Sequence, residues 1–164
     1  SRHTALTRAI EKVGPAVDSD NPDLRALRDN DSKLIVYHGW SDPDISPVAS
    51  INYFEDVVEL IGDDIRAPNY ETALHSTQNF FRLFMVPGMG HCAGGPGPDR
   101  FDALSAMENW VEYGIAPDSI QASKIQDGEI TRSRPLCVYP EVATSSGVGS
   151  TDDADNFYCA APTN

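Results

Sequence analysis

Two short apolar runs, separated by a helical pattern, constrain the fold of this chain most strongly. The runs span residues 33–38 and 80–86, and turn-forming glycine and proline residues follow each one. Short continuous apolar runs are typical of strands that are buried on both faces of a parallel sheet. Between the runs, apolar residues recur at helical spacing from Pro47 to Leu60, and Gly62 predicts the end of that helix. Strand, helix and strand in succession predict an α/β fold.

A second amphipathic pattern follows the second run. It predicts a helix from Asp99 to Gly114, with Asp99 as the N-cap and Gly114 as the C-cap. Residues 63–78 show no clear period, so the sequence leaves their structure open. The apolar positions expected on the inner face of the second helix are Phe101, Leu104, Met107, Trp110 and Val111.

The two ends of the chain differ in character from this central part. Residues 1–32 are polar and are expected to form a lead-in segment, which leaves residues 33–164 for the α/β part. Residues 122–132 alternate as a hairpin does, whereas residues 135–164 are rich in loop-forming residues. Parallel sheets usually contain about five strands or more, so the fold is expected to be incomplete on its own.

The charge of the chain excludes some classes of partner. Its 25 acidic and 12 basic side chains give a formal net charge of -13. Nucleic acids and anionic membranes attract clustered Lys and Arg, so we expect neither as a partner. No apolar run reaches the roughly 18 residues that a membrane span needs. The three cysteines form no Cys-x-x-Cys pair, which argues against a zinc or redox site. Their odd number means that at least one has no internal partner, and three reduced, buried thiols stay an alternative.

Asp42 and His91 occupy equivalent places, each in the turn after a predicted strand. Ligands of open α/β sheets bind beyond the carboxyl ends of the strands, so both side chains should point at one site. A histidine base needs a carboxylate to hold its tautomer and to stabilise its charged form. Asp44 competes for the role of the acid, but Asp42 lies nearer the strand end. A turn-forming role for Asp42 stays open, and a metal site that includes His38 is disfavoured because ligand spacing is missing.

No nucleophile accompanies this acid and base. In α/β-hydrolases the nucleophilic serine precedes the acid, which precedes the histidine. None of the serines before Asp42 has the flanking glycines of the Gly-x-Ser-x-Gly turn, and Ser145 and Ser146 follow His91. The chain is therefore expected to be the C-terminal portion of an α/β-hydrolase fold, with the nucleophile outside it.

The residues around the acid and base resemble those of the tannase and feruloyl esterase family. The resemblance extends from about residue 13 to residue 159, and its most specific element is a His-Cys pair in a glycine-rich loop. The matching segments are His38-Gly39-Trp40-Ser41-Asp42-Pro43, Val86-Pro87-Gly88-Met89-Gly90-His91-Cys92, and residues 93–97, 99–104, 110–112 and 134–140. The resemblance implies that Asp42 is the triad acid and His91 the base.

The resemblance also implies a role for each cysteine. Cys92 would bridge to a cysteine beside the nucleophilic serine, in the N-terminal half of the protein, and Cys137 would pair with Cys159. Disulfides imply secretion to an extracellular or periplasmic compartment, where Asn30 in its Asn-Asp-Ser sequon could carry a glycan in a eukaryotic host. The family's calcium site belongs to a lid domain that this sequence does not contain. No cofactor is expected for catalysis.

The implied activity is hydrolysis of small aromatic esters by a serine carboxylesterase. Hydroxycinnamate, gallate and terephthalate esters are the expected substrates, and Trp40 and Ile45 are candidates to contact them, whereas Met89 is expected in the core. The alternative is a non-catalytic binding or scaffold fragment of the same fold, which the missing serine favours. An aminopeptidase or lipase of this fold would give no reason for Cys92.

Overall fold

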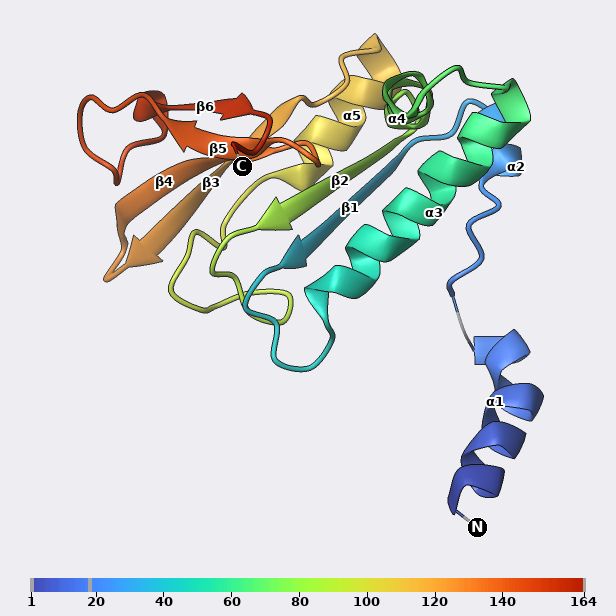
Figure 1. The fold of residues 1–164 in the computed structure, drawn as a ribbon. Helices are drawn as coiled ribbons and strands as arrows, with labels where there is room; N and C mark the ends of the chain where they lie inside the picture. Colours follow the sequence, from blue (N-terminus) through green and yellow to red (C-terminus); the bar gives the residue numbers. More distant parts are fainter. Residues whose placement is uncertain (1, 18, 164) are drawn as a thin grey trace.

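A parallel pair of strands forms the centre of the structure (Figure 1). The computed structural model describes residues 2–17 and 19–163. Strands β1 (Leu34–Gly39) and β2 (Phe81–Val86) pair in parallel along their whole length. Their carboxyl ends therefore lie at the same edge of the sheet, as the sequence predicts.

Helix α3 (Pro47–Ile65) follows β1 and packs against one face of this sheet (Figure 1). Proline at its first turn suits the helix start, where the backbone N–H has no intrahelical partner. Burial of each large apolar side chain contributes roughly 1.5–3 kcal/mol, so this stripe fixes α3 on the strands. The buried stripe of the helix consists of Phe54, Val57, Val58 and Ile61, and it packs against Phe81 and Leu83 of β2.

The prediction that Gly62 ends this helix is wrong. The helix continues to Ile65 and ends at Arg66, which has a left-handed backbone (φ 54). A side chain at Gly62 would bring its Cβ to 2.9 Å from the Cβ of Ala73. The glycine is therefore required for the close approach of the next helix and not for a cap.

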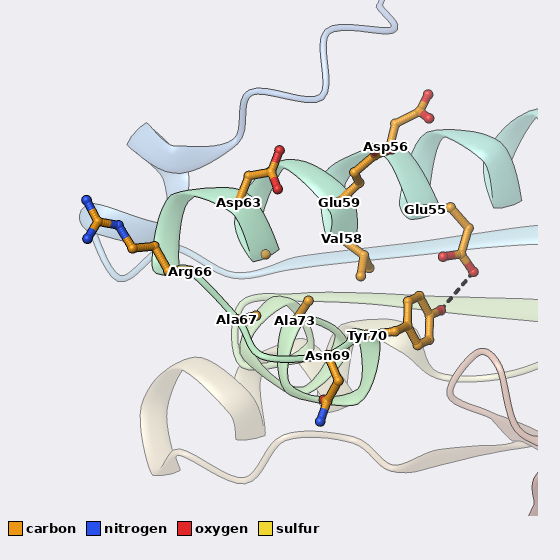
Figure 2. Close-up of a pocket in the computed structure, with 11 residues that line it drawn as sticks. Glu55, Asp56, Val58, Glu59, Asp63, Arg66, Ala67, Asn69, Tyr70 and Ala73 are labelled. Atoms are coloured by element: carbon orange, nitrogen blue, oxygen red, sulfur yellow. Dashed lines mark hydrogen bonds between the residues drawn. The ribbon is translucent and has the colours of Figure 1, made fainter.

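That next helix, α4 (Tyr70–Gln78), occupies the stretch whose structure the sequence left open. The Asn69 side chain caps it by accepting a hydrogen bond from the Thr72 N–H at 2.9 Å. The Tyr70 hydroxyl donates to Glu55 of α3 at 2.9 Å and ties the two helices together (Figure 2).

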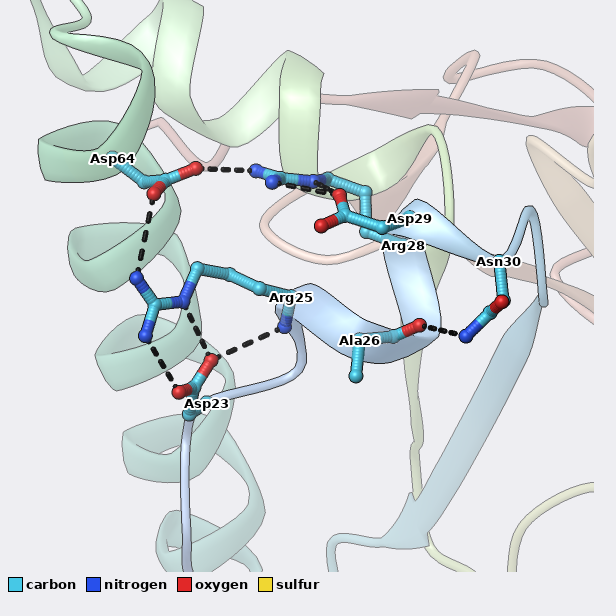
Figure 3. A network of polar contacts seen from close by, with 7 residues as sticks. All are labelled: Asp23, Arg25, Ala26, Arg28, Asp29, Asn30 and Asp64. Carbon is cyan, nitrogen blue, oxygen red and sulfur yellow. Dashed lines mark hydrogen bonds and ion pairs between the residues drawn. The ribbon is translucent and has the colours of Figure 1, made fainter.

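The lead-in segment contains α1 (Arg2–Val17) and α2 (Arg25–Asp29). Two arginines, Arg25 and Arg28, reach Asp64 of α3 at 3.4 and 2.9 Å (Figure 3). Exposed ion pairs of this kind contribute about 0–1 kcal/mol, so they orient α2 more than they stabilise it. Leu24 and Leu27 pack against the core beneath α3.

The second face of the sheet carries α5 (Ala103–Tyr113) and the hairpin of β3 (Ser119–Gln126) and β4 (Glu129–Cys137). The hairpin agrees with the predicted alternation. The predicted N-cap is wrong, because Asp102 and not Asp99 accepts the hydrogen bond from the Ser105 N–H. The core on this face includes Phe84, Val86, Met89, Ile120, Ala122, Leu136 and Val138.

The expected inner face of α5 is only partly buried. Trp110 is 3% exposed, whereas Leu104 and Val111 are 69% and 61% exposed. The side of α5 that contains Ala106 and Trp110 packs against the rest of the protein. The described residues leave the apolar side that contains Leu104 and Val111 uncovered.

The tail contains more regular structure than its composition predicts. Strands β5 (Val142–Ser145) and β6 (Phe157–Ala160) pair antiparallel, with a short 3-10 helix, η1 (Ala154–Asn156), before β6. A disulfide joins Cys137 at the end of β4 to Cys159 in β6. Among the described residues, no helix has the length and apolar character to cross a membrane.

Candidate active site

The turns after β1 and β2 are held against each other at the carboxyl edge of the sheet. The Trp40 N–H donates to the Val86 carbonyl at 2.9 Å, and the Ser41 N–H donates to the Met89 carbonyl at 3.0 Å. A side chain at Gly39 would collide with the Met89 and Gly90 carbonyl oxygens. Glycine at this position therefore allows the two turns, and the side chains that they carry, to meet.

Asp42 and His91 are in direct contact at this edge. His91 Nδ1 lies 2.8 Å from Asp42 Oδ2, although the two residues are 49 positions apart in the sequence. The Asp42 side chain is 4% exposed and the His91 side chain 45% exposed. This is the geometry of a buried orienting carboxylate and an accessible base.

The surroundings of Asp42 keep its carboxylate ionised. Its Oδ1 accepts hydrogen bonds from the Ile45 N–H at 3.0 Å and the Asp44 N–H at 2.8 Å. The Ile45 N–H is the strongest influence that lowers the pKa of Asp42, and the Asp44 N–H and His91 add to it against the opposing effect of burial. In turn, the hydrogen bond to Asp42 raises the pKa of His91.

The second ring nitrogen of His91 is available for chemistry. Among the described residues, no group forms a hydrogen bond with His91 Nε2, and no serine hydroxyl reaches it. With Nδ1–H held by Asp42, Nε2 is the atom that can accept a proton from a nucleophile. The side chain of Asp44 is exposed and does not hold His91, so the geometry favours Asp42 as the acid.

Cys92 follows His91, is exposed and has a left-handed backbone (φ 62); it forms no disulfide with another described residue. The glycine-rich loop after it is anchored by Asp99, whose side chain is 6% exposed. Asp99 accepts from the Gly94 N–H at 2.7 Å and pairs with Lys124 of β3 at 3.1 Å. Lys124 also donates to the Gly95 carbonyl at 2.7 Å. These contacts, which the sequence did not reveal, connect the His91 loop to the hairpin.

The hollow at the acid and base is small. It measures about 130 Å³ and is lined by Ile45, Met89 and Cys92 among others. Pockets for small ligands usually measure about 300–1,000 Å³. The described residues therefore do not form a complete substrate pocket.

The two residues suggested for substrate contact fall in different places. Ile45 lines the hollow of Asp42 and His91 and is 52% exposed. Trp40 lines a separate hollow of about 340 Å³ beside Met85 and Pro140, and its contact with substrate stays a prediction. Met89 is 1% exposed and belongs to the core.

One group of side chains could offer ligands to a metal ion. Ligand atoms of Asp42, Asp44 and His91 lie within 4.8 Å of one another. Asp42 Oδ2 and His91 Nδ1 are already hydrogen-bonded to each other, and a metal would have to displace that bond.

A larger hollow of about 610 Å³ lies along α3, away from Asp42 and His91 (Figure 2). It is lined by Glu55, Asp63 and other residues that include no histidine, serine or cysteine, so its lining supplies neither a histidine base nor a serine or cysteine nucleophile.

The fold combines parallel strands with flanking helices, and its site places an acid and a base after successive strands, in the order that α/β-hydrolases use. Residues 2–160 match the family model described as tannase and feruloyl esterase. The chain belongs to this family.

Individual relatives agree with this assignment. An uncharacterized esterase of Xanthomonas campestris pv. campestris is 42% identical, over 92% of this chain and 30% of its own length. The mono(2-hydroxyethyl) terephthalate hydrolase of Piscinibacter sakaiensis is 43% identical, over 85% of this chain and 22% of its own. The crystal structure of feruloyl esterase B from Aspergillus oryzae superposes with a TM-score of 0.73 at 29% identity, over 85% of this chain and 29% of its own. The chain thus spans less than a third of these relatives.

Proposed function

We propose that this chain is the C-terminal part of the α/β-hydrolase domain of a serine carboxylic ester hydrolase. The observation that carries the proposal is the 2.8 Å contact between a buried carboxylate and an accessible imidazole at the carboxyl edge of a parallel sheet. In this proposal Asp42 is the triad acid and His91 the base. The relatives' shared description as esterases supports the reaction type.

The reaction proceeds through an acyl-enzyme. The serine Oγ bonds to the ester carbonyl carbon while its proton passes to Nε2 of His91. The ester bond then breaks, and His91 returns the proton to the leaving alcohol. A water molecule then attacks the carbonyl carbon of the acyl-enzyme while its proton passes to His91. The bond to the serine Oγ breaks, His91 returns the proton to that oxygen, and the acid is released. Throughout, Asp42 holds Nδ1–H and stabilises the imidazolium that forms.

The serine comes from a segment outside these 164 residues, and Cys92 is the link to it. In this proposal the exposed thiol of Cys92, directly after His91, forms a disulfide with a cysteine next to that serine. The uncovered apolar side of α5 and the small size of the hollow agree with a missing counterpart. The Cys137–Cys159 disulfide supports an oxidising compartment, and hence secretion.

The proposed substrates are esters of aromatic acids. This part of the proposal rests on the relatives, which include a terephthalate ester hydrolase and feruloyl esterases. In this proposal Ile45, which lines the hollow, contacts the substrate. A scaffold fragment without catalysis is the competing function, and it gives no reason for the Asp42–His91 contact.

The test is hydrolysis of a fluorogenic hydroxycinnamate ester by the full-length protein, compared with a His91→Gln variant. We expect turnover by the wild type and its loss in the variant. Equal, background-level rates for both proteins would favour the scaffold function.

A further inference from the structure

The carboxylate of Asp42 has a second histidine partner that the proposed mechanism does not use. His38, on β1, places its Nε2 at 3.2 Å from Asp42 Oδ2 and at 3.3 Å from the Ile45 carbonyl oxygen. Its Nδ1 lies 2.7 Å from the Ser50 hydroxyl of α3. The His38 side chain is 10% exposed, so a run of hydrogen bonds beneath the site connects Ser50, His38, Asp42 and His91.

The neighbours of His38 determine which of its nitrogens donates. Both atoms near Nε2, a carboxylate oxygen and a carbonyl oxygen, can only accept, so Nε2 must carry a proton. The Ser50 hydroxyl can donate or accept, so it can pair with His38 Nδ1 whether or not that nitrogen carries a proton. His38 therefore donates to Asp42 in both of its protonation states.

Among the described residues, the two histidines are the groups that bond to Asp42 Oδ2. The two backbone hydrogen bonds to Asp42, from Asp44 and Ile45, both go to Oδ1. A carboxylate held through one oxygen can turn about that contact, and Oδ2 is the oxygen that His91 requires. We propose that His38, supported by Ser50, is a positioning residue that holds Asp42 Oδ2 toward His91. The proposal rests on the proposed function and deepens it. It also makes the position of α3, the helix that contains Ser50, important for the geometry of the active site.

Two variants of His38 distinguish its hydrogen bond to Asp42 from a role in packing alone. His38→Phe keeps a ring of similar size and removes the donor, whereas His38→Gln keeps an N–H group near the position of Nε2. Val36→Ala is the matched control, because Val36 lies on the same strand and face, packs against the α3 core and makes no side-chain hydrogen bond.

The first readout is the titration of His91 by NMR in the full-length protein selectively labelled with 15N-histidine. Asp42 and Asp44 are the charged groups that act on His91, and none of these variants alters them. We expect the raised pKa of His91 in the wild type, His38→Gln and Val36→Ala, and a fall toward the ordinary histidine value in His38→Phe.

The second readout is ester hydrolysis by the full-length protein. His38→Phe should lower kcat about tenfold at unchanged KM, because a charge-assisted hydrogen bond is lost while no substrate contact changes. The acidic limb of its pH–rate profile should move to lower pH, and His38→Gln should restore both properties.

An unchanged His91 titration in a folded His38→Phe variant would overturn the proposal and leave His38 a packing residue. If that variant does not fold, Ser50→Ala serves instead: a shift in the same direction supports the proposal and no shift overturns it. If the wild type hydrolyses no ester, the proposed function fails, and the titration still decides the role of His38.

Discussion

Replacement of Asp42 by Asn changes one atom at the centre of the hydrogen-bond network. The remaining oxygen can still accept from the Asp44 and Ile45 N–H groups. The new NH2 group then takes the place of Oδ2 and faces His91 Nδ1 at 2.8 Å and His38 Nε2 at 3.2 Å. Two donors cannot bond to each other, so His91 must leave Nδ1 bare and carry its proton on Nε2. That is the atom that has to receive the proton of the serine.

A base in the wrong tautomer costs roughly 10⁴-fold in kcat. We expect this loss in Asp42→Asn with little change in KM, because the substitution removes no substrate contact. The assay is hydrolysis of a fluorogenic hydroxycinnamate ester by the full-length protein. Asp44→Asn is the matched control and should stay within about threefold of the wild type, because its side chain does not hold His91. An Asp42→Asn enzyme within tenfold of the wild type, or an Asp44→Asn enzyme that is equally impaired, would refute the reasoning.

Three further predictions follow from the site and its supports. Because its carboxylate partner raises the pKa of His91, kcat/KM should fall as the pH drops through a value above that of an ordinary histidine; a pH–rate limb at or below the ordinary value would contradict this. Lys124→Met removes the shorter ion pair of the buried Asp99 and leaves only Arg100, at 4.0 Å. The free energy of unfolding in urea should fall by about 3 kcal/mol, and an unchanged midpoint would show that the Asp99–Lys124 pair is unimportant. Replacement of both Cys137 and Cys159 by Ala opens a 22-residue separation and should cost roughly 3 kcal/mol in the same assay, whereas no loss would mean that the bridge does not constrain the unfolded chain.

The central part of the fold and site could be predicted because its signals are local. Buried strands produce continuous apolar runs, and the parallel pairing of two such strands places the turns after them at one edge. That rule predicts that Asp42 and His91 lie near each other, and Gly39 leaves the room in which their two turns meet.

Other features depend on contacts that the sequence does not encode locally. Gly62 has the appearance of a helix stop, but its role is set by Ala73 on the next helix. Asp99 has the appearance of an N-cap, but tertiary structure assigns it to Lys124 and the Gly94 N–H.

Exposure was hard to predict for the same reason. Leu104 and Val111 fit the inner face of a helix by spacing, yet the described residues leave them uncovered. Trp40 lies in the motif that carries the acid, and the turn directs it into a neighbouring hollow. Periodicity identifies an apolar side of an element but not the partner that covers it.

The proposed completion of the site by a second segment is tested most directly at Cys92. The measurement is peptide mapping of the full-length protein by mass spectrometry, with and without reduction, after a fluorophosphonate has labelled reactive serines. We predict that Cys92 is disulfide-linked to a peptide outside these 164 residues, and that the labelled serine lies beside the cysteine of that peptide. Recovery of Cys92 as a free thiol, with no labelled serine, would contradict the proposed esterase.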